Sequence, residues 1–203
     1  MAVFLLIRHG HNDSIGKAIV GRSAGICLNR QGSDQAQGLI ERFSGLPIDA
    51  IFSSPLERCR ETAAPLARER KLEVQVRPGL HEIEFGEWTG ETFGHLAQVP
   101  RWRLFNTFRS GTRIPGGELM AEVQARMVAE IEGLRQEFPE GTLALFSHGD
   151  PIKAAIAHYA GFPLDMMLRY EISLASVSIL AIHDTGPRIL CINHTGSRLP
   201  MSY

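Results

Sequence analysis

The sequence predicts an α/β fold with three layers, in which helices cover both faces of a mostly parallel central sheet. Short apolar runs alternate along the chain with stretches of helical period, an order typical of parallel sheets. The chain has 203 residues, of which 44% are apolar and 21% are charged. This is enough for one buried core. We therefore expect residues 1–203 to form a single domain.

The first part of the chain alternates strand and helix. An apolar, partly β-branched run over 3–8 predicts a buried strand. Residues 10–32 contain several glycines and little periodicity, so we expect a loop. Apolar residues at three- and four-residue spacing predict a helix over 33–46. Three further elements follow: a strand at 50–54, a helix opened by Pro55 and continuing to about Lys71, and a strand at 73–76.

Residues 79–117 differ in composition from the rest. They contain both tryptophans, four of the ten phenylalanines and much glycine, without a clear period. We expect loops and short helices here, forming a lid-like insert at about 84–117 over the functional face, where specificity elements are usual. The next stretch, 117–138, has a clear helical period, and Pro139 ends it.

The last third begins by repeating the pattern of the N-terminus. A strand at 142–146 leads to His148 and Gly149, and a helix closed by Gly161 follows. Two more apolar runs, "SVSILAIHD" and "RILCIN", flank a Thr-Gly-Pro turn. They predict a hairpin at the edge of the sheet.

Composition excludes several classes of partner. A formal net charge of −1 leaves no general basic field for nucleic acid. The three cysteines form no CxxC pair, which argues against a disulfide framework and a structural zinc site and favours a reducing, cytoplasmic setting. The N-terminal run "AVFLLI" is too short to span a membrane. We expect no nucleic-acid partner and no membrane partner.

Three polar motifs follow predicted strands. They are Arg8-His9-Gly10, the "SSPLER" segment ending at Arg58, and Ser147-His148-Gly149. Ligands of parallel sheets bind beyond the carboxyl ends of the strands, so these motifs can converge at one opening. Two histidines, two arginines and a nearby acid are the groups needed for metal-free phosphoryl transfer through a phosphohistidine.

With these motifs in place, the chain resembles the histidine phosphatase superfamily, the phosphoglycerate mutase-like group. Five blocks match in order and span nearly the whole chain: "LLIRHGHN", "GRSAGICLNRQGSDQA", "IFSSPLERCRETA", "LHEIEFGEWTG" with "PGGE", and "LFSHGDPIKAA". The resemblance implies the phosphoglycerate mutase-like fold and the phosphatase branch. It further implies hydrolysis of a small phosphorylated metabolite with no metal and no cofactor.

The resemblance also implies a role for individual residues. His9 would attack phosphorus, Arg8 and Arg58 would clamp the phosphate oxygens, and His148 would be a third donor. Glu82 would protonate the leaving oxygen and then activate water. Spacing alone does not separate Glu82 from Glu84 and Glu87 as the acid, whereas the family pattern points to Glu82.

The substrate pocket departs from the family pattern at several positions. Asn12 and Ile15 stand where most members have threonine and asparagine, so Asn12 is expected to bind phosphate through its amide. Gly21 and Arg22 complete the expected substrate-binding set, with surface placement of Arg22 as the alternative. The other departures are His81, Thr89 and Leu119.

Three other functions compete with hydrolysis by a phosphohistidine. The His9-x-His11-x-Asp13 pattern suggests a metal-dependent hydrolase, but Ser14 stands where such clusters want another histidine, and the arginines would repel a cation. A phosphoglycerate mutase is the alternative within the family, although mutases tend to be longer. A non-catalytic phosphate-binding protein would usually lack the nucleophile or the acid. The sequence leaves open whether the protein forms a homodimer.

The remaining candidate residues have simpler interpretations. We expect core or surface placement for the other histidines, surface or supporting placement for Arg60 and Arg113, packing in the insert for Trp88 and Trp102, and burial for Cys59. The other histidines are His11, His95, His158, His183 and His194.

Overall fold

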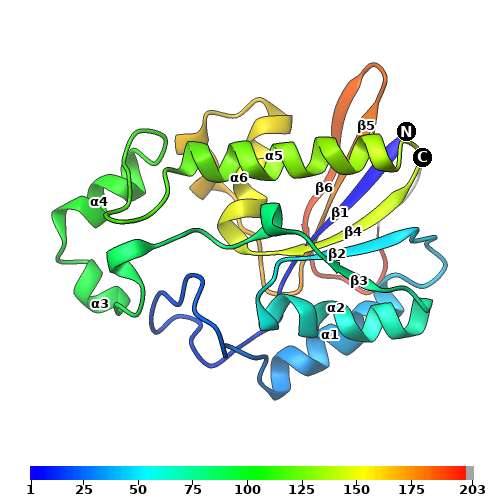
Figure 1. Ribbon diagram of the computed structural model, residues 1–203, viewed down its shortest axis with the longest axis horizontal. Helices are drawn as coiled ribbons and strands as arrows, with labels where there is room; N and C mark the ends of the chain where they lie inside the picture. Colours follow the sequence, from blue (N-terminus) through cyan, green and yellow to red (C-terminus); the bar gives the residue numbers. More distant parts are fainter. Residues whose placement is uncertain (200–203) are drawn as a thin grey trace.

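The computed structural model describes residues 1–199, and its centre is one six-stranded sheet (Figure 1). The strand order is β3-β2-β4-β1-β5-β6, with parallel pairing from β3 to β1 and antiparallel pairing from β1 to β6. The predicted edge hairpin is therefore confirmed. The strands are β1 (Ala2–Arg8), β2 (Ala50–Ser53), β3 (Val74–Val76), β4 (Thr142–Ser147), β5 (Val177–His183) and β6 (Gly186–His194).

Helices cover both faces of this sheet, which confirms the three-layer prediction. Figure 1 shows α1 (Arg30–Arg42) and α2 (Glu57–Arg70) below the sheet, and α5 (Met120–Glu137) and α6 (Gly149–Ala160) above it.

Strand β1 shows why the fold has two cores. Its side chains alternate, so Phe4 and Leu6 pack with α5 and α6 while Leu5 and Ile7 pack with α1 and α2. Each of these side chains is buried, which contributes about 1.5–3 kcal/mol apiece. A strand buried on both faces is an unbroken apolar run in the sequence, as this one is.

Some helix boundaries differ from the prediction. Helix α1 begins at Arg30, before the predicted start, because the side chain of Asn29 accepts a hydrogen bond from the Gly32 N–H and caps the helix there. The helix ends at Arg42. Helix α2 begins at Glu57, so Pro55 precedes the helix and does not open it. A 3-10 helix, η3 (Leu164–Arg169), was not predicted.

The insert lies at one end of the sheet (Figure 1) and packs in a third core that it shares with α5, α6 and η3. The rings of Trp88 and Trp102 meet edge to face at 5.3 Å, and Phe105 packs against both. Its elements are η2 (Gly86–Trp88), α3 (Phe93–Leu96) and α4 (Pro100–Thr107), and η1 (Pro78–Leu80) precedes it. Within residues 1–199, no helix has the length and apolar character needed to cross a bilayer.

Candidate active site

The three polar motifs meet at the carboxyl edge of the parallel strands. Arg8 pairs with Ser147 in the β1–β4 register, and the His9 N–H continues the ladder with a 3.0 Å hydrogen bond to the Ser147 carbonyl. Ser53 lies opposite Phe146 on the other side of β4. Strand register therefore brings together residues that lie far apart in the sequence.

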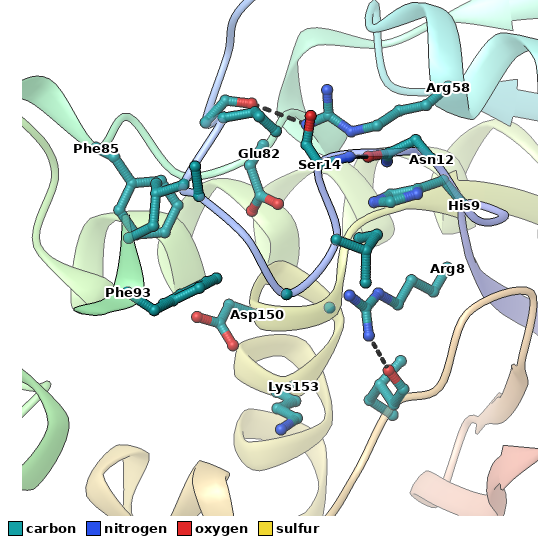
Figure 2. Close-up of a pocket in the computed structure, with 18 of the residues that line it drawn as sticks. Arg8, His9, Asn12, Ser14, Arg58, Glu82, Phe85, Phe93, Asp150 and Lys153 are labelled. Atoms are coloured by element: carbon teal, nitrogen blue, oxygen red, sulfur yellow. Dashed lines mark hydrogen bonds between the residues drawn. The ribbon is translucent and has the colours of Figure 1, made fainter. Parts of the chain in front are cut away.

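A cavity of about 350 Å³ opens at this edge (Figure 2). Arg8, His9, Asn12, Arg58 and Glu82 line one end of it. The Gly10–Gly21 loop, the insert and the first turns of α6 supply most of the other walls. The predicted insert therefore does contribute to the walls of the cavity.

The imidazole of His9 is held as a neutral ring. Its Nδ1 lies 2.8 Å from the Gly10 carbonyl oxygen, which can only accept, so Nδ1 carries the proton and Nε2 keeps its lone pair. Burial, reinforced by the charges of Arg58 and Arg8, lowers the pKa of His9 to about 3. The ring is therefore in the form that a nitrogen nucleophile requires.

Around His9 lie buried N–H groups with no partner among the described residues. They are Nε of Arg8, Nε and Nη1 of Arg58, and Nδ2 of Asn12. The other ends of these side chains are anchored: Arg8 Nη1 donates to the Ile172 carbonyl at 2.6 Å, and Arg58 Nη2 to that of Gly21 at 2.8 Å. Asn12 Oδ1 accepts the Ser14 N–H. Buried donors left over in this way suit an anion with several oxygens.

Glu82 is the carboxyl group that faces His9 across the cavity (Figure 2). Its Oε1 accepts the Ile83 N–H at 2.9 Å, and burial raises the pKa of its carboxyl group. Glu84 instead points to Arg22 and is 40% exposed, and Glu87 lies on the surface. Of the three glutamates that the sequence left open, Glu82 is the one that lines the cavity.

His148 lies behind the wall of the cavity. It is fully buried, its ring centre is 5.3 Å from that of His9, and its Nε2 lies 2.9 Å from the Ser54 hydroxyl. Its Nδ1 is 3.6 Å from Glu82 Oε2. Burial, the largest cause, lowers the pKa of His148 well below its usual value, so this ring is neutral too.

Arg22 does not line the cavity but supports the segment that carries Glu82. Its Nε donates to the Glu82 carbonyl at 2.9 Å and its Nη2 to Glu118 at 3.0 Å. Arg126 mirrors it, with bonds to the same carbonyl and to Glu118. Glu118 belongs to the quoted "PGGE" block, but no sequence signal placed Arg126 here.

Sequence reasoning missed the far end of the cavity. Asp150 and Lys153 lie one turn apart on α6, and Arg109 pairs with Asp150 at 2.6 Å. Their signal was available, because residues three apart on a helix lie on one face and the helix that carries them begins directly after His148. Trp102 also needs correction, since it lines the cavity in addition to packing in the insert.

His11 and Asp13 belong to a different cluster from His9. Both bond to the side-chain amide of Asn29, at 2.8 Å in each case. Over residues 1–199, no three His, Cys, Asp or Glu side chains are grouped so that they could hold a metal. Although His9, His11 and Asp13 are close in the sequence, their side chains therefore do not meet at one point.

The remaining placements agree with the simpler interpretations. Cys59 is buried against His148, and burial raises the pKa of its thiol. Arg113 is half exposed and pairs with Glu122, and Arg60 lies on the surface.

Comparison with known proteins gives a family match over nearly the whole chain. The model of the histidine phosphatase superfamily (branch 1) matches residues 4–195. A protein of Mycobacterium tuberculosis named bifunctional protein Rv2228c is 31% identical over 198 residues, which are 95% of this chain and 54% of that protein. The chain therefore spans about half the length of this relative.

Other relatives match over nearly their full length. Phosphoserine phosphatase 1 of Hydrogenobacter thermophilus is 28% identical over 204 residues, covering 96% of this chain and 93% of that protein. The solved structure of Bacillus stearothermophilus YhfR superposes with a TM-score of 0.91 at 21% identity and covers 97% of this chain and 99% of that one. The fold is thus the phosphoglycerate mutase-like fold expected from the resemblance.

Proposed function

Because the chain belongs to the histidine phosphatase superfamily, we propose that it hydrolyses a small phosphate monoester, without a metal, through a phosphohistidine on His9. One observation carries the proposal. The free Nε2 of a neutral His9 lies among buried N–H donors of Arg8, Arg58 and Asn12 that have no partner in the described chain. These donors suit the phosphate oxygens, and the nitrogen suits attack on phosphorus.

In the first step, the lone pair of His9 Nε2 forms a bond to phosphorus and the bond from phosphorus to the ester oxygen breaks. Glu82 gives its proton to that oxygen, so the product leaves as a neutral alcohol. The raised pKa of Glu82 keeps the proton available until then. Arg8, Arg58 and Asn12 bind the transferring oxygens, where charge is spread in the transition state.

In the second step, water attacks phosphorus and the bond to His9 breaks. Glu82, now a carboxylate, takes a proton from the water, and inorganic phosphate leaves with both residues restored. We assign His148 as a donor at the edge of this site. In the tautomer with the proton on Nδ1, the Ser54 hydroxyl donates to Nε2 and Nδ1 faces Glu82 Oε2 at 3.6 Å.

The size of the cavity and the relatives narrow the substrate to a small metabolite. About 350 Å³ is at the lower end of small-molecule sites. The relative from Hydrogenobacter thermophilus is named a phosphoserine phosphatase, so phosphoserine is the first compound to test on this chain. Sugar phosphates and phosphoglycerates complete the panel.

The proposal is tested with wild-type protein and the variants His9→Ala and His11→Ala. We expect release of phosphate from the panel by the wild type and by His11→Ala, with no change on adding a chelator, and a loss of about 10⁴-fold or more in His9→Ala. Quenching in alkali should trap phosphate on His9, because the bond between phosphorus and the imidazole nitrogen is stable in base and labile in acid, and mass spectrometry would detect it. Activity that needs metal and survives His9→Ala would overturn the mechanism.

The mutase alternative is decided by the product. Incubation with 3-phosphoglycerate yields phosphate and glycerate if water reaches the phosphohistidine. Efficient conversion to 2-phosphoglycerate with little phosphate release would replace hydrolysis by mutase action.

A further inference from the structure

The far end of the cavity contains charged groups that phosphoryl transfer does not use. Asp150 and Lys153 line the cavity from α6 and lie below the reacting groups in Figure 2, with the ammonium end of Lys153 directed further away from them. Arg109 reaches the same region from the segment that follows α4. Phe85 and Phe93 form an apolar wall facing them.

The charges along the cavity nearly balance once a phosphate is bound. Its two negative charges match Arg8 and Arg58, and Glu82 is neutral in its acid form. Arg109 is already paired, with 2.6 Å between its Nη1 and Asp150 Oδ2. Burial alone would raise the pKa of Asp150, but the charge and hydrogen bond of Arg109, followed by the charges of Lys153 and Arg8, outweigh it and lower that pKa. Among the described residues that line the cavity, Lys153 is the cation left over.

Lys153 is a buried cation whose charge is poorly compensated. Its side chain is 9% exposed, and the carboxylate nearest to it, Glu171 at 3.6 Å, is 76% exposed. Water screens such an exposed partner, so the pair contributes little. The Tyr170 hydroxyl donates to the Lys153 carbonyl at 2.5 Å and fixes this turn of the helix.

We propose that Lys153 binds a carboxylate on the organic part of the substrate. The substrate class is then a phosphate ester whose carbon skeleton packs against Phe85 and Phe93 and ends in a carboxylate. A single ammonium matches one negative charge, which favours a carboxylate over a second phosphate dianion. The inference rests on the proposed function for its phosphate end and adds the recognition of the other end.

Binding tests this subsite without depending on turnover. We would measure the dissociation constants of two matched compounds, 3-phosphoglycerate and glycerol 3-phosphate, by calorimetry on the His9→Ala variant. These compounds differ in having a carboxylate or a hydroxymethyl group. We expect the carboxylate to strengthen binding about 10-fold or more, as a charge-assisted hydrogen bond does. A second pair of compounds, 4-carboxyphenyl phosphate and phenyl phosphate, repeats the comparison with a greater distance between the phosphate and the carboxylate.

The variants separate this role from a structural one. Lys153→Met in the same background should bring the ratio of the two dissociation constants close to 1, and Lys153→Arg should keep most of it. Lys71→Met, the same replacement on the exposed end of α2, is the matched control and should leave the ratio unchanged. Because both compounds are measured on one preparation, a general loss of folded protein cancels.

Three results would overturn the subsite: a ratio near 1 in both pairs, a ratio that Lys153→Met does not change, or no binding of either carboxylate. Turnover by the wild type decides the proposed function separately. If the wild type hydrolyses phosphate esters but binds carboxylates no better, the proposed function holds and the role of Lys153 is wrong. If the protein prefers the carboxylate in binding but shows no turnover, the role of Lys153 holds and the proposed function is wrong.

Discussion

At the scale of single residues, burial acts in complementary ways on the two side chains that we propose to react, His9 and Glu82. It lowers the pKa of His9, which is a base, and raises that of Glu82, which is an acid. Burial disfavours the charged form of either group, so it favours the neutral imidazole of His9 and the protonated carboxyl group of Glu82. An uncharged imidazole can attack, and an uncharged carboxyl can donate a proton. One environment therefore prepares both partners of the first step.

The role of Glu82 predicts how Glu82→Gln depends on the leaving group. We expect kcat/KM to fall about 10²–10⁴-fold for an alkyl phosphate, which needs a proton on its oxygen. The loss should be much smaller for p-nitrophenyl phosphate, whose product is a stable anion. The comparison uses kcat/KM because kcat also contains hydrolysis of the phosphohistidine.

The same variant has a signature in the pH profile. As pH rises through the raised pKa of Glu82, the wild type loses its proton donor, so kcat/KM for the alkyl phosphate should fall. The glutamine variant should lack this alkaline decline. Glu87→Gln, at the surface, is the control and should behave as the wild type. Equal losses on both substrates would show that Glu82 is not the acid.

At the residue scale, the sequence predicted which residues line the cavity better than it predicted the contacts that their side chains make. His9, Arg8, Arg58, Asn12 and Glu82 all line one cavity, and their chemical roles stay a prediction. Arg22 was expected to bind substrate, yet its hydrogen bonds go to the segment of Glu82. A residue type and its spacing do not reveal which of two nearby surfaces a long side chain will reach.

At the scale of elements, the N-terminus of α1 packs directly on the loop that carries His9. A Cβ added to Gly32 would overlap the His11 carbonyl oxygen, and one added to Gly10 would lie 2.8 Å from the Gly32 carbonyl oxygen. Gly10 also donates its N–H to Thr62 of α2. Two helices thus hold the backbone of the loop after β1.

This close approach predicts opposite effects for two glycines of one helix. Gly32→Ala should lower the free energy of unfolding by about 1–3 kcal/mol through overpacking, and should reduce turnover by shifting the loop. Gly38→Ala is the matched control, because its site is exposed and has no atom within 4 Å. It should stabilise by about 0.5–1 kcal/mol, the usual gain over glycine inside a helix.

Denaturant unfolding of both variants measures these changes. A stable, fully active Gly32→Ala would show that α1 and the loop can move apart without cost. Strong destabilisation by Gly38→Ala would contradict the open surroundings of that position.

At the scale of the whole molecule, the site joins segments from most of the chain. The loops after β1, β2 and β4, the segment with Glu82, the insert and α6 all converge at one edge of the sheet (Figure 1). A phosphate bound there would contact residues from several of these segments at once. Its binding should therefore stabilise the entire fold against unfolding.

Because phosphate contacts several segments at once, inorganic phosphate should raise the melting temperature of the protein. At about 100 times its dissociation constant it contributes about 2.7 kcal/mol, or roughly 5–10 °C for a chain of this size. The measurement is a thermal melt at constant ionic strength, with chloride as the control anion. Arg58→Met should lose most of the shift, whereas Arg113→Met, on the surface, should keep it. Equal shifts in phosphate and chloride would argue against an anion site.

The sequence by itself determined the layers of this protein and predicted the chemical groups of its candidate site. Apolar runs buried on both faces and helical periods depend on local spacing, so they can be interpreted without coordinates. The histidine and arginine motifs follow strands, so the topology of a parallel sheet already implied their convergence.

The tertiary structure alone decided which groups face the cavity. Contacts between segments distant in the chain separated Glu82 from Glu84 and left Lys153 poorly compensated. The pairing of Arg109 with Asp150 spans 41 positions, and no local pattern predicts it. Charge balance in a cavity depends on three-dimensional distances, and these exist only once the chain has folded.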